Sequence, residues 1–75
     1  MYGFDFEVVE NNSENIIKVN DDYVVVGYDD EDNLECCIVG YNDNNKLVYV
    51  SELNDRWSDE ESKYILNKIC NNYLN

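Results

Sequence analysis

The sequence of 75 residues predicts an α+β fold, in which an antiparallel meander of four or five strands carries one C-terminal helix on one face. Short apolar segments recur through residues 2–53 and are separated by clusters of Asn and Asp, which favour turns. A segment at about residues 58–74 instead has the apolar spacing of an amphipathic helix. We therefore expect a single domain over residues 1–75, with the strands first and the helix last.

The N-terminal segment alternates apolar and polar side chains. Its apolar residues fall at every second position, namely Tyr2, Phe4, Phe6 and Val8. This period predicts a strand with one solvated face. The polar run from Glu10 to Asn15 predicts a loop. The apolar residues at 16, 17 and 19 predict a second strand, with a helical turn after Ser13 as the less favoured alternative.

Three further strands are expected in the middle of the chain. Asn20–Asp22 predicts a tight turn, because Asn and Asp accept a left-handed backbone. The valine-rich segment Tyr23–Tyr28 predicts a strand buried on both faces near the centre of the sheet. Leu34–Tyr41 and Leu47–Leu53 predict the last two strands, with Cys36 and Cys37 on opposite faces.

Two segments of the chain repeat the same pattern. Val26–Leu34 and Val39–Leu47 each run through Val-Gly-Tyr into five polar residues and restart an apolar segment at a leucine. The repeat predicts two consecutive hairpin corners. Gly27 and Gly40 hold equivalent places in it, where we expect a bulge or a close backbone approach.

The helix has both a start signal and an apolar stripe. Ser58 followed by Glu61 predicts a capping box, and the acidic residues 59–61 suit the positive end of the helix dipole. The apolar stripe consists of Ile65, Leu66, Ile69, Cys70 and Tyr73. We expect this stripe to lie across one face of the sheet.

Acidic side chains outnumber basic ones by 17 to 5, which gives a formal net charge of −12. No lysine or arginine lies between Lys18 and Lys46. Carboxylates fill that interval: Asp21, Asp22, Asp29, Asp30, Glu31, Asp32, Glu35 and Asp43. The charge disfavours direct binding of nucleic acid or anionic lipid and favours a basic protein as partner.

These carboxylates, together with Tyr28 and Tyr41, are the predicted partner-binding residues. The two tyrosines occupy equivalent places in the repeat, directly before its polar loops. Tyrosine is common at interfaces because it combines an apolar ring with a polar tip. Tyr28 and Tyr41 are expected either to anchor a partner within a ring of carboxylates or to cover the edge of the core.

Catalysis and metal binding find little support in the sequence. The chain has no histidine, the commonest general base, and no catalytic or cofactor motif, so we expect neither an enzyme nor a cofactor. A calcium site at Asp29–Asp32 is disfavoured, because the loop lacks the glycine and the final glutamate of an EF-hand. The three cysteines have no metal or redox spacing, which favours a reducing cytoplasm. Nothing at the N-terminus resembles a signal peptide and no apolar run approaches about 20 residues, so we expect neither export nor a membrane-spanning segment.

The predicted strands from Tyr23 to Leu53 are apolar on both sides, whereas the helix covers one face only. The second face should therefore be covered by something else. The candidates are the N-terminal strand, a second copy of the chain in a homodimer, or a partner protein.

In size, acidity and lack of a catalytic motif, the chain resembles the small phage-encoded inhibitors of bacterial defence, among them anti-CRISPR proteins and other DNA mimics. The resemblance implies a stoichiometric inhibitor that binds a basic nucleic-acid-binding protein or nuclease complex, with Asp29–Asp32, Glu35 and Asp43 in the contact surface. An immunity protein or antitoxin that neutralises a basic nuclease or toxin would use the same charges. An acidic structural or assembly subunit that dimerises through its sheet is the second alternative.

Overall fold

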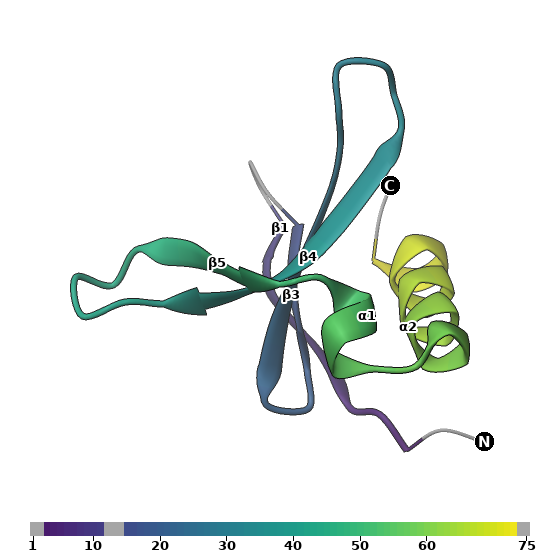
Figure 1. The fold of residues 1–75 in the computed structure, drawn as a ribbon, viewed down its shortest axis with the longest axis horizontal. Coiled ribbons are helices and arrows are strands. Elements are labelled where there is room, and N and C mark those ends of the chain that lie inside the picture. Colours follow the sequence, from purple (N-terminus) through teal and green to yellow (C-terminus); the bar gives the residue numbers. More distant parts are fainter. Residues whose placement is uncertain (1–2, 12–14, 74–75) are drawn as a thin grey trace.

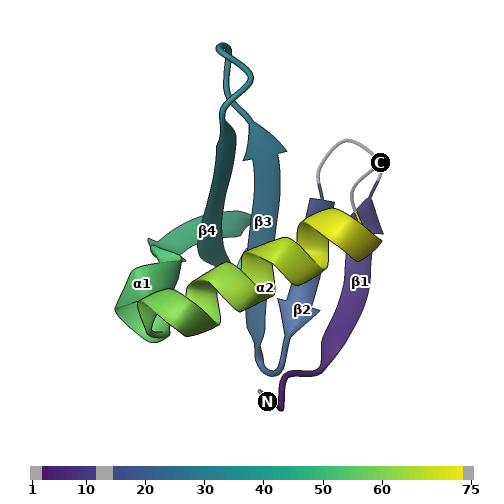
Figure 2. The same ribbon diagram turned by 90° about the vertical axis from the view of Figure 1, so that its right-hand side faces the viewer.

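The computed structural model describes residues 3–11 and 15–73, and it confirms the α+β fold. Within these residues one antiparallel sheet follows the order of the chain: β1 (Phe6–Asn11), β2 (Asn15–Val19), β3 (Asp22–Tyr28), β4 (Leu34–Tyr41) and β5 (Leu47–Ser51). Two helices come last: α1 (Leu53–Arg56) and α2 (Asp59–Asn72). The predicted meander is present, and α2 lies across one face of it (Figure 1, Figure 2).

The first strand lies later in the chain than the alternation predicted. β1 spans Phe6–Asn11, so the strand predicted over Tyr2–Val8 is wrong in its bounds, and its start lies outside the described residues. Phe4 precedes β1 and packs against the rings of Trp57 and Tyr64, at 6.0 and 6.1 Å between ring centroids. Contact with other aromatic rings, and not a place in the sheet, explains why this residue is apolar.

The predicted loop from Glu10 to Asn15 is also wrong in its bounds. Glu10 pairs with Ile16, and Asn11 pairs with Asn15, so both neighbouring strands continue into the polar segment. A bulge next to Val8 places one extra residue in β1. Polarity misled the prediction because β1 is an edge strand, and an edge strand tolerates polar side chains on its solvated side.

β2, the turn that follows it and β3 are present as predicted, except that Asp22 begins β3 and does not belong to the turn. The segment before the turn is a strand and not a helical turn. Asn20 has a left-handed backbone with φ of 56°, and its Oδ1 accepts the N–H of Asp5 at 3.0 Å. β3 lies at the centre of the sheet, where Val24 and Val26 are buried on the helix side and Val25 is half-buried on the other side.

β4 has its predicted bounds, whereas β5 ends at Ser51 and not at Leu53. Leu53 begins α1, and only 5% of it is exposed. The chain turns at this helix, and Trp57 after it is buried in the core. Leu53 therefore fits the apolar pattern of the strand in sequence but belongs to the core beneath α2.

The bulge predicted at a glycine of the repeat lies elsewhere. It falls between Ile38 and Val39, where β4 changes register against β5. Gly40 does approach β5, because a Cβ at this position would lie 3.4 Å from the Val50 side chain. At Gly27 a Cβ would meet nothing within 4 Å, so the close approach predicted there is wrong.

The capping box at the start of α2 is confirmed. Ser58 Oγ accepts the N–H of Glu61 at 3.2 Å, and Glu61 Oε1 accepts the N–H of Ser58 at 3.2 Å. The predicted stripe packs on the sheet, with Ile65 and Ile69 fully buried. The resulting core consists of Ile17, Val19, Val24, Val26, Ile38, Leu53, Trp57, Ile65 and Ile69.

β1 does not fold over the second face of the sheet, although Ile16 and Val39 on that face are buried. This strand extends the sheet beside β2, so the N-terminal cover is the wrong choice among the three predicted candidates. Figure 1 shows both helices on one side of the sheet, with the β4–β5 hairpin projecting to the other side. Besides Leu34 at the start of β4, the exposed large apolar side chains of this hairpin are Tyr41, Val48, Tyr49 and Val50.

Candidate partner-binding surface

The loop between β3 and β4, residues 29–33, is built around the side chain of Asp29. Asp29 Oδ1 accepts the N–H of Glu31 at 2.8 Å and the N–H of Asn33 at 2.9 Å. The backbone closes the loop as well, because the N–H of Asp29 donates to the carbonyl of Asn33 at 2.9 Å. Asp32 completes the turn with a left-handed backbone, φ 63°. Four consecutive acidic residues are thus held in one ordered turn.

These hydrogen bonds also fix the charge of Asp29. The N–H of Asn33, and to a smaller extent that of Glu31, stabilise the carboxylate form and lower the pKa of Asp29 from its usual value of 3.8. Asp30, Glu31 and Asp32 point to solvent as exposed residues. The loop therefore presents a concentrated negative charge at neutral pH.

The loop between β4 and β5, residues 42–46, has the same backbone. Asn42 Oδ1 accepts the N–H of Asn44 at 2.9 Å and the N–H of Lys46 at 3.0 Å. Asn45 has φ of 65°, matching its counterpart in the first loop. The predicted pair of hairpin corners is confirmed as a structural repeat. This second loop, however, carries one carboxylate, that of Asp43, and one ammonium group, that of Lys46.

Asp21 and Asp22 lie away from both loops, at the turn between β2 and β3. This turn is at the opposite end of β3 from the 29–33 loop (Figure 2). Asp22 Oδ2 accepts the Nε–H of Arg56 at 3.0 Å in an ion pair. The structure therefore divides the predicted carboxylates among three separate places and does not gather them into one site.

The two predicted tyrosines differ in their surroundings. Tyr28 is 64% exposed and stands at the base of the acidic loop. Tyr41 packs edge-to-face on Tyr23, with 5.3 Å between ring centroids, and is 43% exposed. Tyr28 is thus the better placed of the two to contact a partner, whereas Tyr41 helps to cover the second face of the sheet.

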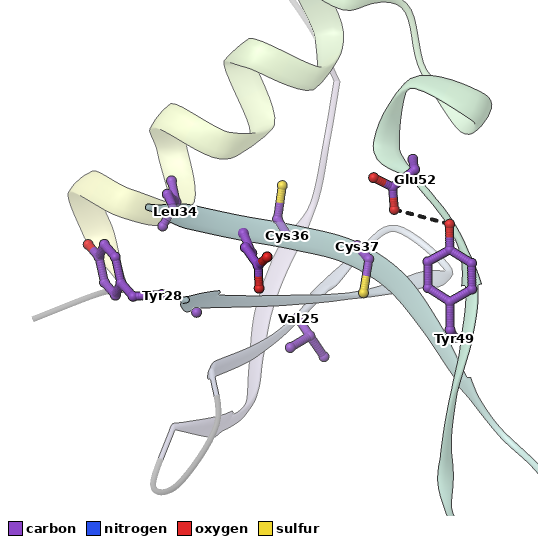
Figure 3. A pocket seen from close by; sticks show the side chains of 9 residues that line it. Val25, Tyr28, Leu34, Cys36, Cys37, Tyr49 and Glu52 are labelled. Carbon is purple, nitrogen blue, oxygen red and sulfur yellow. Dashed lines mark hydrogen bonds between the residues drawn. The ribbon is translucent and has the colours of Figure 1, made fainter. Parts of the chain in front are cut away.

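A groove of about 600 Å³ lies beside Tyr28, along β4. Figure 3 shows Cys36 and Cys37 on opposite sides of β4, as the sequence predicted, with Tyr49 and Glu52 at the end of the groove. Tyr49 donates its hydroxyl hydrogen to Glu52 Oε2 at 3.0 Å, and this bond raises the pKa of the Tyr49 phenol. The lining residues are Val25, Gly27, Tyr28, Leu34, Glu35, Cys36, Cys37, Tyr49 and Glu52.

Of the predicted partner-binding residues, only Tyr28 and Glu35 line this groove. Sequence analysis did not identify Tyr49 or Glu52 as site residues. The sequence pattern that could have identified them is a tyrosine followed three positions later by a glutamate, near the end of a strand. This pattern becomes informative only when β5 is known to end at Ser51, between the two residues.

The cysteines of the groove are not activated thiols. Burial is the main cause that raises the pKa of both Cys36 and Cys37, and negative neighbours such as Glu52 raise it further. Both thiols therefore remain protonated at neutral pH. Because a cysteine is a nucleophile only as the thiolate, neither is expected to be reactive. Cys36, Cys37 and Cys70 are free cysteines.

Across residues 3–11 and 15–73, no group of three or more Cys, Asp or Glu side chains is arranged to hold a metal ion. No helix in the described part of the chain is long and apolar enough to cross a bilayer. Comparisons with protein-family models, with curated proteins and with solved structures find no match to the chain.

Proposed function

We propose that the protein is a stoichiometric inhibitor, which binds the nucleic-acid-binding surface of a basic protein and blocks it. The observation that supports the proposal is the 29–33 loop, in which a run of four carboxylates lies at the tip of a hairpin that projects from the body (Figure 1). A channel that holds nucleic acid is lined by Lys and Arg side chains, and it attracts such an array as it attracts phosphates.

The proposed binding has two components. The net charge of −12 steers the protein toward a basic surface and makes association fast and sensitive to salt. Tyr28 and the groove next to it provide apolar contact that salt does not screen. A specific complex should therefore weaken as salt rises but survive at about 0.5 M, where the Debye length is only a few ångströms.

The first test is capture of a partner from a bacterial lysate with the tagged protein, at low salt and at about 0.5 M salt. The inhibitor is then titrated into the captured protein while that protein has its own nucleic acid bound. We expect the nucleic acid to be released, with a break in the titration curve at one equivalent of inhibitor. If only a broad set of basic proteins is recovered, and all of them are lost in salt, the proposal is wrong.

A variant then tests the loop itself. It carries Asp29→Asn, Asp30→Asn, Glu31→Gln and Asp32→Asn. The fold should persist, because Asn42 already forms the same turn with an amide in place of a carboxylate. Affinity for the captured partner should fall on the order of 100-fold at low ionic strength, since several charge pairs are lost together.

A charge-matched control removes four other carboxylates. It carries Asp5→Asn, Glu7→Gln, Glu10→Gln and Asp55→Asn, so that both variants change the net charge from −12 to −8. The control should bind within a few-fold of the wild type, because only long-range steering is reduced. Equal losses in the two variants would show that net charge, and not the 29–33 loop, determines affinity.

The exposed apolar side chains of the β4–β5 hairpin favour a second candidate, a subunit that dimerises through its sheet. Tyr49 is 62% exposed on the second face of the sheet, and its neighbour Val50 in β5 is 56% exposed. Light scattering at micromolar concentration distinguishes the two functions. A mass of 8.8 kDa excludes the dimer, whereas twice that mass without affinity for any basic protein favours it.

A further inference from the structure

The first half of β4 has a free edge. β4 pairs with β3 from Leu34 to Val39, but it pairs with β5 only from Ile38 to Tyr41. In the described part of the chain, Leu34–Cys37 thus has a strand on one side and none on the other. Figure 2 shows this part of β4 at the outer margin of the sheet, above α1. Its outward N–H and C=O groups are available to a further strand.

Two grooves follow this free edge, one on each side of β4. The lining of the 600 Å³ groove includes side chains of the second face, such as Val25 and Cys37. A second groove of about 430 Å³ lies between β4 and α2 and is lined by Leu53 and Leu66 among others. Both grooves include Cys36 and Glu52. Side chains of an added strand point alternately to the two faces, so they would enter the two grooves in turn.

The charge around the edge determines which strand fits. Glu35 and Glu52 border the larger groove, and Glu52 and Asp59 border the smaller one, against a single cation, Lys63. The hydrogen bond from Tyr49 holds the Glu52 carboxylate at the end where the two grooves meet. A second copy of the chain would bring a charge of −12 to this edge, whereas a strand rich in Lys and Arg would neutralise it.

From this geometry we infer that Leu34–Cys37 accepts an extended, basic segment of a partner protein as a sixth strand. The inference rests on the proposed function for the class of partner, and it adds where and how the partner is contacted. The pairing spans about 13 Å of β4, which is enough for a few backbone hydrogen bonds. Side chains in the grooves and lysines facing Glu35 and Glu52 supply the rest of the affinity.

The experiment uses a synthetic peptide of about eight residues that alternates Lys and Val. Its control is the same peptide with N-methyl groups on alternate residues, which keeps the charge but removes the backbone donors of one edge. Successive N–H groups of a strand point to alternate sides, so every second amide of Leu34–Cys37 exchanges rapidly with solvent in the free protein. The unmethylated peptide should slow the exchange of these amides with solvent. The methylated peptide should bind at least about tenfold more weakly than the unmethylated one.

Two substitutions test the side chains. Glu52→Gln should weaken peptide binding, whereas Glu7→Gln removes the same charge from β1, at the opposite edge of the sheet, and should leave binding nearly unchanged. Equal binding of both peptides, or slowed exchange confined to the 29–33 loop, overturns the inference. Slowed exchange at Leu34–Cys37 without peptide, at concentrations where light scattering shows a dimer, would assign the edge to a second copy instead.

The outcomes for the edge and for the proposed function are separable. If the captured partner depends on the 29–33 loop but leaves the amides of Leu34–Cys37 unprotected, the inhibitor proposal stands and the inference about β4 is wrong. If the peptide protects these amides but no nucleic-acid-binding protein is displaced from its ligand, the edge is a binding site and the inhibitor proposal is wrong.

Discussion

The 29–33 and 42–46 loops have the same backbone but different chemistry. Each begins with an Asx side chain that accepts two backbone N–H groups and ends near a residue with a left-handed backbone. The first loop nevertheless carries four carboxylates, whereas the second carries one carboxylate and one lysine. The turn therefore does not require the acidic residues, since Asn42 closes it without a charge. The turn itself does not explain why residues 30–32 are acidic, which is consistent with the binding role that we propose for them.

The largest effect expected within this comparison comes from the left-handed residues. Asp32→Val and Asn45→Val should each destabilise the protein by about 1–2 kcal/mol, because a β-branched side chain is strained at a φ near +60°. Glycine at either position should be tolerated. Urea denaturation of the four variants measures the difference. If valine is costly in one loop and harmless in the other, the two turns are not equivalent in solution.

The equivalence of the loops could be predicted because it is a local property. Val-Gly-Tyr before each loop and leucine after it mark the ends of strands, and Asn and Asp between them favour turns. The bounds of β4 and the capping box of α2 are local in the same way, and both were predicted correctly. The bounds of β1 were not, because backbone pairing at an edge strand can include polar residues such as Glu10.

The candidate site was harder to predict because it depends on where strands stop relative to one another. Sequence analysis placed all the carboxylates between Lys18 and Lys46 in one surface, whereas β3 separates Asp22 from the 29–33 loop by its full length. The free edge at Leu34–Cys37 exists because β5 ends at Ser51 and α1 turns the chain away. Neither an apolar pattern nor a charge run contains that information.

A smaller effect is expected from the residues that open the two loops. Asn42→Ala should destabilise the protein by about 1 kcal/mol, because two backbone N–H groups lose their acceptor. Asn42→Asp should restore the acceptor and hence the stability. Asp29→Ala should also lower the melting temperature, and Asp29→Asn should not. If alanine is as stable as the wild type at position 42, water replaces the side chain and the Asx contact does not stabilise the turn.

The smallest effect distinguishes the loops by pH. Asp29 has a pKa below 3.8 in the folded protein because the N–H groups of Asn33 and Glu31 stabilise its carboxylate, whereas Asn42 does not titrate. A depressed folded pKa means that the contribution of Asp29 to stability is fully present above about pH 4 and is lost as the pH falls through the lowered value. Asp29→Asn should remove this acid-sensitive contribution. An NMR titration of the Asp29 carboxyl carbon, compared with a peptide of residues 27–35, measures the shift. A pKa in the folded protein equal to or above that in the peptide would show that the carboxylate, unlike the Asn42 amide, is not engaged by the turn.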